Sequence, residues 1–433
     1  MVVTSAPFEI TNQPVVKRLP NGLTIIAEKM STAAVNLNIW LGVGSRVESD
    51  AINGMAHFLE HMIFKGTPQL QCGEFERLIE ERGAITNAAT SQDYTHYYIT
   101  TAPKDFAKLA PLQVELLLNA NLQDSDFERE RPVILEEIRR SEDNPRRRVF
   151  QHAMVLNFDH LPYRRPVLGP TSVIENLSAA QMREFHRRWY HPQNMTAVVV
   201  GDLPVDQLIA TVEESFEQAL SNRQHAIIRE PLEGIPVTTP EEPFQSIARA
   251  DYSDATLQQA RLVMSWRVPG LSQLSETYAL DILASILGQG RTARLVQDLR
   301  ETRGLVNSIS ASNITYGEQG VFYISANLAV EHLDTVEAAV LEHIQRFHEE
   351  HVSGAELHRV RTQVANRYVF ANETSSDRAN MYGYYHAMTG DIENALNYPN
   401  SIRTVDAEAI QTAVKRYLPV TAYGVLRLQP ESN

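Results

Sequence analysis

Three residues that could hold and use a metal ion lie in the segment Gly54-Met-Ala-His-Phe-Leu-Glu-His-Met-Ile-Phe: His57, Glu60 and His61. They form H-x-x-E-H, the reverse of the zinc-peptidase pattern H-E-x-x-H. If the segment is helical, residues four apart share a face, so the two imidazoles converge on one ion. Two neutral imidazoles suit Zn²⁺, whose catalytic sites have three protein ligands and an open position for water. With Glu60 beside that water as proton acceptor, the motif predicts metal-assisted peptide hydrolysis.

Chance does not readily produce this motif. From 14 His and 53 acidic residues in 433 positions, roughly 0.06 matches to His-x-x-acid-His are expected. The alternative is a surface helix whose two histidines, four residues apart, take part in ion pairs. Because a motif alone is a hypothesis, a third ligand has to be found elsewhere in the chain.

The stretch from Phe127 to Arg140 offers that ligand. It is rich in charge and carries an apolar stripe through Val133, Ile134 and Ile138. This pattern predicts a helix with Pro132 in its first turn, where a missing N–H costs little. Glu130 and Glu137 are seven residues apart, or two turns, and so share a face. We expect the other acidic side chains of this region to be solvated: Glu128, Glu136 and Glu142.

At this point the chain resembles a known family. The context Gly-x-x-H-x-x-E-H-x-x-F-x-G-T, from Gly54 to Thr67, and the later Glu137 are similar to those of the pitrilysin-type inverzincins. The branch with the mitochondrial processing peptidase and its bacterial relatives is the most similar. Further matching segments are Leu19-Pro-Asn-Gly-Leu, Asn87-Ala-Ala-Thr-Ser-Gln-Asp-Tyr-Thr, Pro192-Gln-Asn-Met-Thr, Val198-Val-Val-Gly-Asp and Arg300-Glu-Thr-Arg-Gly-Leu.

The resemblance implies a role for each candidate residue. One Zn²⁺ per chain would be held by His57, His61 and Glu137, which is separated from His61 by 75 residues, about as the family's third ligand is. Glu60 would act as general base and then as general acid. Glu130 matches a glutamate that supports the site from behind the ligands, by orienting them.

Length and composition set the broad class. At 433 residues, the chain exceeds what one hydrophobic core usually serves, so two domains are expected. Apolar content of 43% and charged content of 21% are typical of a soluble globular protein. No apolar run is long enough for a membrane span, and no signal peptide is recognisable. With Cys72 as the single cysteine, we expect a cytoplasmic location, with periplasmic or organellar alternatives if a targeting segment was removed.

The formal charge of −14 argues against nucleic acid as a partner, because phosphate binding needs a basic face. It favours cationic peptides through electrostatic steering. Solubility alone is an equally good reason for the acidity.

Two similar α+β domains are predicted, at residues 1–220 and 246–433, joined by a proline-rich linker at 221–245. Both halves show strands and helices in the same order, and Glu81-Arg82-Gly83 and Thr302-Arg303-Gly304 occupy equivalent places. This mixture fits a mainly antiparallel sheet with helices on one face. The resemblance implies that the two domains form half of a clamshell.

The expected elements of the first half are strands at 35–41, 87–99 and 197–200 and helices at 75–83 and 106–118. Those of the second half are strands at 261–268, 309–312 and 321–328 and helices at 277–287, 295–302 and 333–347.

Substrate binding is predicted at Asn87 and Ala88. The small residues Asn87-Ala-Ala-Thr-Ser could form an exposed strand edge that pairs with an extended peptide. On composition alone, a strand packed closely under a helix is the better interpretation. The resemblance favours the substrate-binding edge.

The second half departs from the family pattern. Related peptidases carry an Arg and, seven residues on, a Tyr that contact the substrate carbonyl; here Arg300 matches, but the other position is Asn307. We therefore expect a heterodimer with a homologous, zinc-free subunit that supplies an Arg/Tyr pair, with a homodimer as the second choice. The acidic residues with which the mitochondrial enzyme reads an arginine are replaced by Arg147 and Gln151. Arginine-directed cleavage is therefore not expected.

The predicted function is a zinc-dependent endopeptidase acting on unfolded or short peptides. The competing hypothesis is a non-catalytic core or peptide-holding subunit of the same family. Such subunits usually have eroded zinc motifs, whereas this motif is intact.

Overall fold

The computed structural model describes residues 13–223 and 239–431, which form two compact units. Unit 1 comprises residues 1–139, 165–236 and 370–396, and unit 2 comprises 140–164, 237–369 and 397–433. Unit 1 therefore includes residues 370–396 from the second half of the sequence, and unit 2 includes residues 140–164 from the first half. The sequence, by contrast, predicts two continuous halves. Of the expected linker at 221–245, residues 224–238 lie outside the described part.

The sheet of unit 1 has six strands in the order β1-β2-β6-β3-β5-β4. Every neighbouring pair is antiparallel except β2 and β6. The strand bounds are β1 Val15–Arg18, β2 Thr24–Lys29, β3 Val35–Leu41, β4 Ile85–Thr90, β5 Thr95–Thr101 and β6 Met195–Gly201. The stretch expected as one strand at 87–99 is therefore two antiparallel strands.

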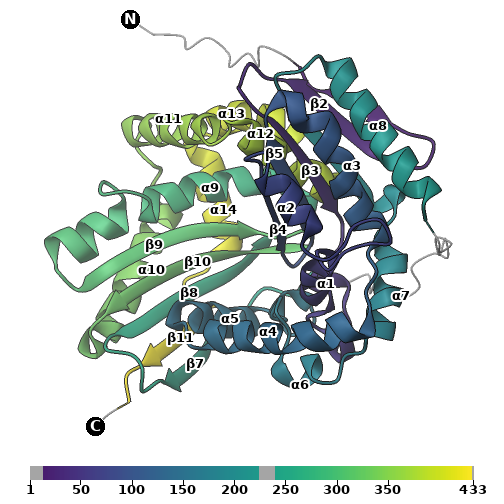
Figure 1. Ribbon diagram of the computed structural model, residues 1–433. Coiled ribbons are helices and arrows are strands. Elements are labelled where there is room, and N and C mark those ends of the chain that lie inside the picture. Colours follow the sequence, from purple (N-terminus) through teal and green to yellow (C-terminus); the bar gives the residue numbers. More distant parts are fainter. Residues whose placement is uncertain (1–12, 224–238, 432–433) are drawn as a thin grey trace, which may run out of the picture. The chain divides into compact units, whose positions relative to one another are not determined.

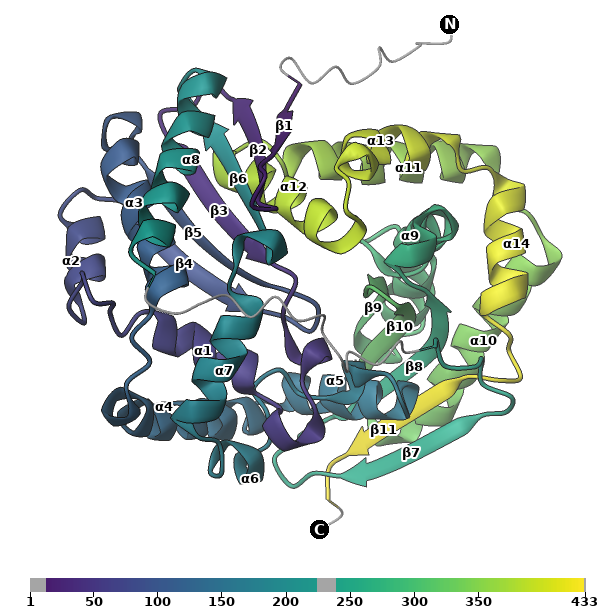
Figure 2. The same ribbon diagram turned by 90° about the vertical axis from the view of Figure 1, so that its right-hand side faces the viewer.

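Both faces of this sheet are covered. On β3, Leu37 and Ile39 point into a core with helices α1, α3 and α8, which span Met55–Ile63, Pro103–Asn119 and Val205–Ser221. The alternate residues face the other way, since Asn38 donates to Asn380 of α12, Ser375–Thr389, and Trp40 packs against Tyr384. The main helical layer lies on one face as predicted, and α12, from the far end of the sequence, covers the other (Figure 2).

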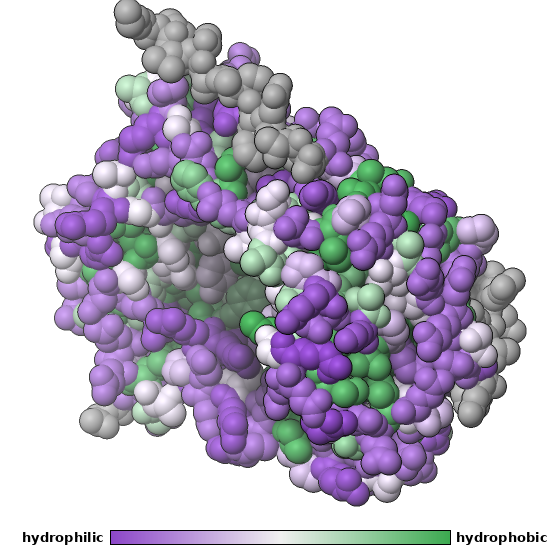
Figure 3. All heavy atoms as spheres, turned by 45° about the horizontal axis from the view of Figure 1, so that its top comes forward, coloured by the Kyte–Doolittle hydropathy of each residue, from purple (hydrophilic) through white to green (hydrophobic). Residues whose placement is uncertain are grey.

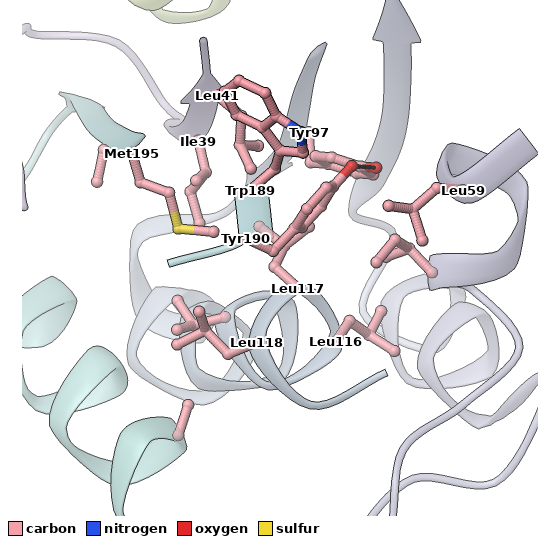
Figure 4. Packing of buried hydrophobic residues seen from close by; sticks show 14 of the residues in the cluster. Ile39, Leu41, Leu59, Tyr97, Leu116, Leu117, Leu118, Trp189, Tyr190 and Met195 are labelled. Atoms are coloured by element: carbon pink, nitrogen blue, oxygen red, sulfur yellow. Dashed lines mark hydrogen bonds between the residues drawn. The ribbon is translucent and has the colours of Figure 1, made fainter. Parts of the chain in front are cut away.

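The core of unit 1 reaches from the sheet to the helix that carries the H-x-x-E-H motif. Leu59 of α1 belongs to the same buried cluster as Ile39, Met195 and residues 116–118 of α3 (Figure 4). At its centre, the hydroxyl oxygens of Tyr97 and Tyr190 lie 2.8 Å apart, so two buried polar atoms satisfy one another.

The sheet of unit 2 has five strands in the order β7-β11-β8-β10-β9, with β7 and β11 parallel and the other pairs antiparallel. Both faces of this sheet are also covered by helices. Met264 of β8 packs into the core with α9, α10 and α14, whereas Val263 contacts the cluster that contains Val149 and Ala153 of α5. The bounds are β7 Ala248–Ser253, β8 Ala260–Pro269, β9 Val306–Thr315, β10 Gln319–Leu328, β11 Gly424–Gln429, α5 Pro145–Asn157, α9 Leu274–Gly288, α10 Leu333–Glu349 and α14 Ala407–Tyr417.

The remaining helices complete the chain (Figure 1). They are α2 Glu74–Glu80, α4 Asp124–Glu142, α6 Thr171–Ile174, α7 Ala179–Trp189, α11 Gly354–Phe370 and α13 Glu393–Thr404. The helix expected at 295–302 is a π-helix, Val296–Thr302. The fold class is thus α+β with two mainly antiparallel sheets, as predicted.

The placement of Pro132 in a first turn was wrong. Helix α4 begins two turns earlier, at Asp124, with Asp124 and Asp126 in its first turn, so Pro132 lies inside the helix. Acidic groups in the first turn interact favourably with the helix dipole, which supports the earlier start. Pro132 is exposed there, so the carbonyl that loses its helical partner can bond water.

Hydrophilic side chains dominate the face of the molecule seen in Figure 3, with smaller hydrophobic patches between them. Among the described helices, none combines the length and the hydropathy that crossing a bilayer requires.

Candidate metal centre

Helix α1 presents the motif because its apolar residues recur at helical spacing. Met55, Phe58, Leu59 and Met62 are fully buried, which turns Glu60 and His61 toward the opposite, half-buried face. The residue before the helix is Gly54, whose φ of +98° suits glycine. A Cβ there would lie 2.6 Å from the carbonyl oxygen of Leu168, so the close approach of that loop also requires glycine.

Glu48 anchors the start of α1, and sequence reasoning missed it. Its carboxylate accepts hydrogen bonds from the backbone N–H groups of Gly54 (2.8 Å) and Ala56 (2.7 Å) and from the side chain of Asn53 (2.9 Å). Burial raises the pKa of Glu48 to about 7, against the effect of these bonds. The one available signal was an acidic residue a few positions before a helix start, which is too common to be specific.

Helix α4 carries the third donor to α1. The rings of Phe58 and Phe127 stack with centroids 4.4 Å apart and join the two helices. Oε2 of Glu137 then lies 3.5 Å from Nε2 of His57 and 3.5 Å from Nε2 of His61. The structure thus brings together the three residues that the motif and the resemblance singled out.

The spacing of these atoms fits a zinc ion. One donor atom from each of His57, His61 and Glu137 lies within 4.8 Å of the others. Ligands about 2.1 Å from a tetrahedral zinc lie roughly 3.4 Å from one another, close to the two 3.5 Å separations. Two imidazoles and one carboxylate are also a donor set typical of catalytic zinc.

The protonation of the two histidines differs. Burial, together with the charge of His61, lowers the pKa of His57 to about 4, so its imidazole is neutral at pH 7 and can coordinate. Burial also opposes protonation of His61, but its bonds to Glu137 and Glu130 outweigh this and raise its pKa. Because a metal binds the neutral imidazole, this shift makes proton competition for His61 stronger than for His57.

Glu130 lies behind His61, in the supporting position that the resemblance implies. Its Oε1 is 3.0 Å from Nδ1 of His61, and its Oε2 is 2.6 Å from Nζ of Lys65. Burial works against the charge of Glu130, but the bonds from Lys65 and His61 keep its pKa below the ordinary value. Lys65 was not predicted, although it follows His61 by four residues.

Glu60 sits beside the three donors, and its Oε2 accepts a hydrogen bond of 2.5 Å from Oγ1 of Thr90. Burial raises the pKa of Glu60, while the bond from Thr90 opposes that shift. Thr90 was missed because nothing in the sequence links it to Glu60, thirty residues earlier. It is the last residue of β4, the outer strand of the sheet.

The predicted substrate residues fall into two groups. Asn87 and Ala88 lie on β4, whose outer edge has no neighbouring strand within the described sheet. Arg300 lies in unit 2, on the π-helix Val296–Thr302, and its guanidinium bonds Glu301. Asn307 is exposed on β9 of the same unit.

Comparisons with known proteins show which family the chain resembles. Residues 23–171 match the family model of insulinase, peptidase family M16, and residues 176–364 match the model of the peptidase M16 inactive domain. An uncharacterized zinc protease of Mycobacterium leprae is 31% identical over 313 residues, which is 71% of this chain and 67% of that protein. One from Mycobacterium tuberculosis is 28% identical over 416 residues, 96% of this chain and 93% of that protein.

A solved structure shows the same fold. The crystal structure of a protease from Helicobacter pylori matches with a TM-score of 0.87 and 24% identity, and it covers 97% of this chain and 100% of the other. The H-x-x-E-H motif lies in the part that matches the insulinase model, and the half without it matches the inactive-domain model. The chain therefore belongs to peptidase family M16, whose relatives here are called zinc proteases.

Proposed function

We propose that this protein is a zinc metalloendopeptidase that hydrolyses unfolded or short peptides, with one zinc ion per chain. The observation that carries the proposal is the position of Glu137 Oε2, 3.5 Å from Nε2 of both His57 and His61. A zinc ion at these three donors would acidify a bound water and polarise a peptide carbonyl.

Glu60 is the proton carrier in this proposal. Its carboxylate takes the proton of the attacking water and passes it to the leaving amine. Burial raises the pKa of Glu60, which makes its carboxylate a stronger base toward the attacking water. The hydroxyl of Thr90 holds one carboxylate oxygen, which fixes the orientation of the side chain.

The outer strand β4 would bind the main chain of the substrate. Asn87 and Ala88 lie on its free edge, and the last residue of the same strand, Thr90, touches Glu60. A peptide that pairs with β4 would therefore run past the catalytic carboxylate. Main-chain pairing of this kind binds peptides with little regard to their side chains.

A second subunit would complete the site. Asn307 stands where related peptidases have a tyrosine, and asparagine is too short to replace a phenol as carbonyl donor. Loss of one such donor typically costs about 10²–10³ in rate. We propose a heterodimer with a homologous, zinc-free partner that supplies an Arg/Tyr pair, with a homodimer as the second choice. Full activity of the purified chain alone would exclude the heterodimer.

The decisive experiment replaces Glu60 by Gln. The variant should bind zinc and peptide as the wild type does but should not cleave a quenched fluorogenic peptide, tested with and without a co-expressed homologue. Zinc content is measured by elemental analysis. The control is Glu80→Gln, an exposed glutamate at the end of α2, which should keep full activity.

Two outcomes would contradict the proposal. Cleavage by the Glu60→Gln variant would remove the assigned role of Glu60. A wild-type protein that binds zinc and peptide without cleaving, even beside its partner, would instead be a peptide-holding subunit.

A further inference from the structure

Unit 2 contains a pocket of ≈ 360 Å³ between α5 and the face of the sheet that α5 partly covers. Arg146 and Phe150 contribute from α5, and Arg261, Ser310 and Asn327 are among the residues that strands β8, β9 and β10 contribute. None of these residues belongs to the metal centre. The volume lies at the lower end of the range for ligand pockets, so it suits one or two residues rather than a folded partner.

The floor of the pocket is built by strand register. Arg261, Asn327 and Ser308 are aligned across three strands, so their side chains form one row on the same face. Within this row, the guanidinium of Arg261 donates to Asn327 Oδ1, and Asn327 Nδ2 donates to Ser308 Oγ at 2.8 Å. A second row places Ser310 and Ser325 with their hydroxyl oxygens 3.3 Å apart.

The pocket carries positive charge that its own walls do not neutralise. Its lining contains two arginines and no acidic residue. The buried Nε of Arg261 has no hydrogen-bond partner among the described residues. Burial lowers the pKa of Arg261, and the nearby charge of Arg146 lowers it further. Arginine nevertheless stays protonated at physiological pH, so both charges persist.

Other arginines of unit 2 are paired with acidic residues, so the lack of an acidic partner is specific to the pocket. Arg148, two residues after Arg146 on α5, is paired with Asp254. Arg249 of the same sheet is paired with Glu337 at 2.8 Å. By contrast, no described residue bonds the guanidinium of Arg146. Arg146 lies in the first turn of α5, where the helix dipole also favours an anion.

We propose that this pocket binds a carboxylate of the peptide substrate, either an acidic side chain or the C-terminal carboxylate. The planar guanidinium of Arg146 would form the charge-assisted pair, the positive charge of Arg261 would add to the attraction, and the serine hydroxyls would donate to the second oxygen. The formal charge of −14 opposes a polyanion such as nucleic acid, whereas a single carboxylate needs only the local charge. The choice of a peptide as carrier rests on the proposed function.

The test measures peptide binding to the full chain with catalysis removed by Glu60→Gln. Fluorescent peptides are compared in pairs: an internal Glu against Gln, and a free C-terminal carboxylate against an amide. At least one pair should show about tenfold tighter binding of the carboxylate form. The pair that shows it identifies the source of the carboxylate.

Variants connect this preference to the pocket. Arg146→Gln should remove most of the preference, and Arg146→Glu should reverse it in favour of a peptide with Lys at that position. Arg346→Gln is the matched control, because Arg346 is an exposed arginine on α10 of the same unit and does not line the pocket. Arg146 is exposed, so these variants should fold, which thermal melting of each protein checks.

The outcomes separate this proposal from the peptidase function. Equal binding within both pairs, or an equal loss in Arg346→Gln, overturns the carboxylate site even if the wild type cleaves peptides. A carboxylate preference that depends on Arg146, in a wild-type chain that cleaves nothing, upholds the pocket and rejects the peptidase.

Discussion

Nδ1 of His61 lies 3.0 Å from Oε1 of Glu130. Because Lys65 keeps Glu130 ionised, the carboxylate can only accept, and Nδ1 must carry the proton. With the proton on Nδ1, the neutral imidazole presents a lone pair at Nε2, on the side of Glu137. One residue outside the donor set thus selects the tautomer that coordinates a metal.

Replacing Glu130 by Gln should weaken zinc binding by roughly 10–100-fold without removing a ligand. The amide oxygen can still accept from His61, but its negative charge and its ion pair with Lys65 are gone. Competition against a chelating dye measures the zinc affinity. Glu128→Gln is the matched control on the same helix, since Glu128 is exposed and bonds Arg131; an equal loss there would argue against a specific role for Glu130.

Zinc should raise the melting temperature of the wild type but not that of Glu137→Gln. A ligand that binds the folded state alone stabilises it, by about 2.7 kcal/mol at a hundred times its dissociation constant. Without the carboxylate of Glu137, two imidazoles remain, and most of that stabilisation is lost. Glu136→Gln, at the adjacent position and paired with Arg139, should respond to zinc as the wild type does. Differential scanning fluorimetry with and without zinc distinguishes these results.

Gly54→Ala should destabilise the protein more than Gly73→Ala. Both glycines precede helices with positive φ, +98° and +78°, so alanine adds strain of roughly 1–2 kcal/mol at each. Around Gly73 there is open space, whereas a Cβ on Gly54 would meet Leu168 and Gly169. The collision should cost roughly 1–3 kcal/mol more and displace α1 with its ligands. Urea unfolding and zinc affinity are the measurements, and equal losses for the two variants would contradict the structure.

Asp281→Asn should flatten the pH dependence of stability in the acid range. Burial raises the pKa of Asp281 from 3.8 to about 6, against the bonds that its carboxyl accepts from Asn313 and Tyr398. The folded state therefore favours the protonated acid, and this contribution is complete below pH 3.8 and is lost as the pH rises through 6. The loss is on the order of 3 kcal/mol.

The free energy of unfolding, measured with urea between pH 4 and 8, tests this assignment. The wild type should lose stability relative to the variant up to about pH 6 and run parallel to it above pH 7. Asp254 supplies the opposite case, because its bonds to Thr256 and Arg148 lower its pKa. The contribution of Asp254 should therefore be lost as the pH falls. A wild-type advantage at pH 7 over Asp281→Asn would show that this carboxyl is ionised without penalty.

Local pattern was enough to single out the two histidines of the candidate metal centre. His57 and His61 are one helical turn apart, so any helix over this segment places them on one face. Glu137 was predicted from a resemblance that its distance from His61 supports, and the structure places it beside both histidines. The assignment of these residues to zinc stays a prediction until metal is measured.

Contacts between segments that are distant in the chain could not be predicted from the sequence. The sequence predicted two continuous halves, whereas α5 packs on the sheet of unit 2 and α12 on that of unit 1. Asn38 and Asn380, which join α12 to β3, are 342 positions apart. Periodicity reports that a face is apolar or polar, but not which remote segment covers it.

By itself, the sequence determined the helical spacing of His57 and His61, the α+β class and the family, because these depend on the order of neighbouring residues. Only the tertiary structure decided that Glu48 anchors α1, that Thr90 holds Glu60 and that Arg146 and Arg261 share a pocket without an acidic residue. Each of these relationships joins segments that meet only when the hydrophobic cores form. The local preferences of either segment do not specify such a contact, so only the folded structure shows it.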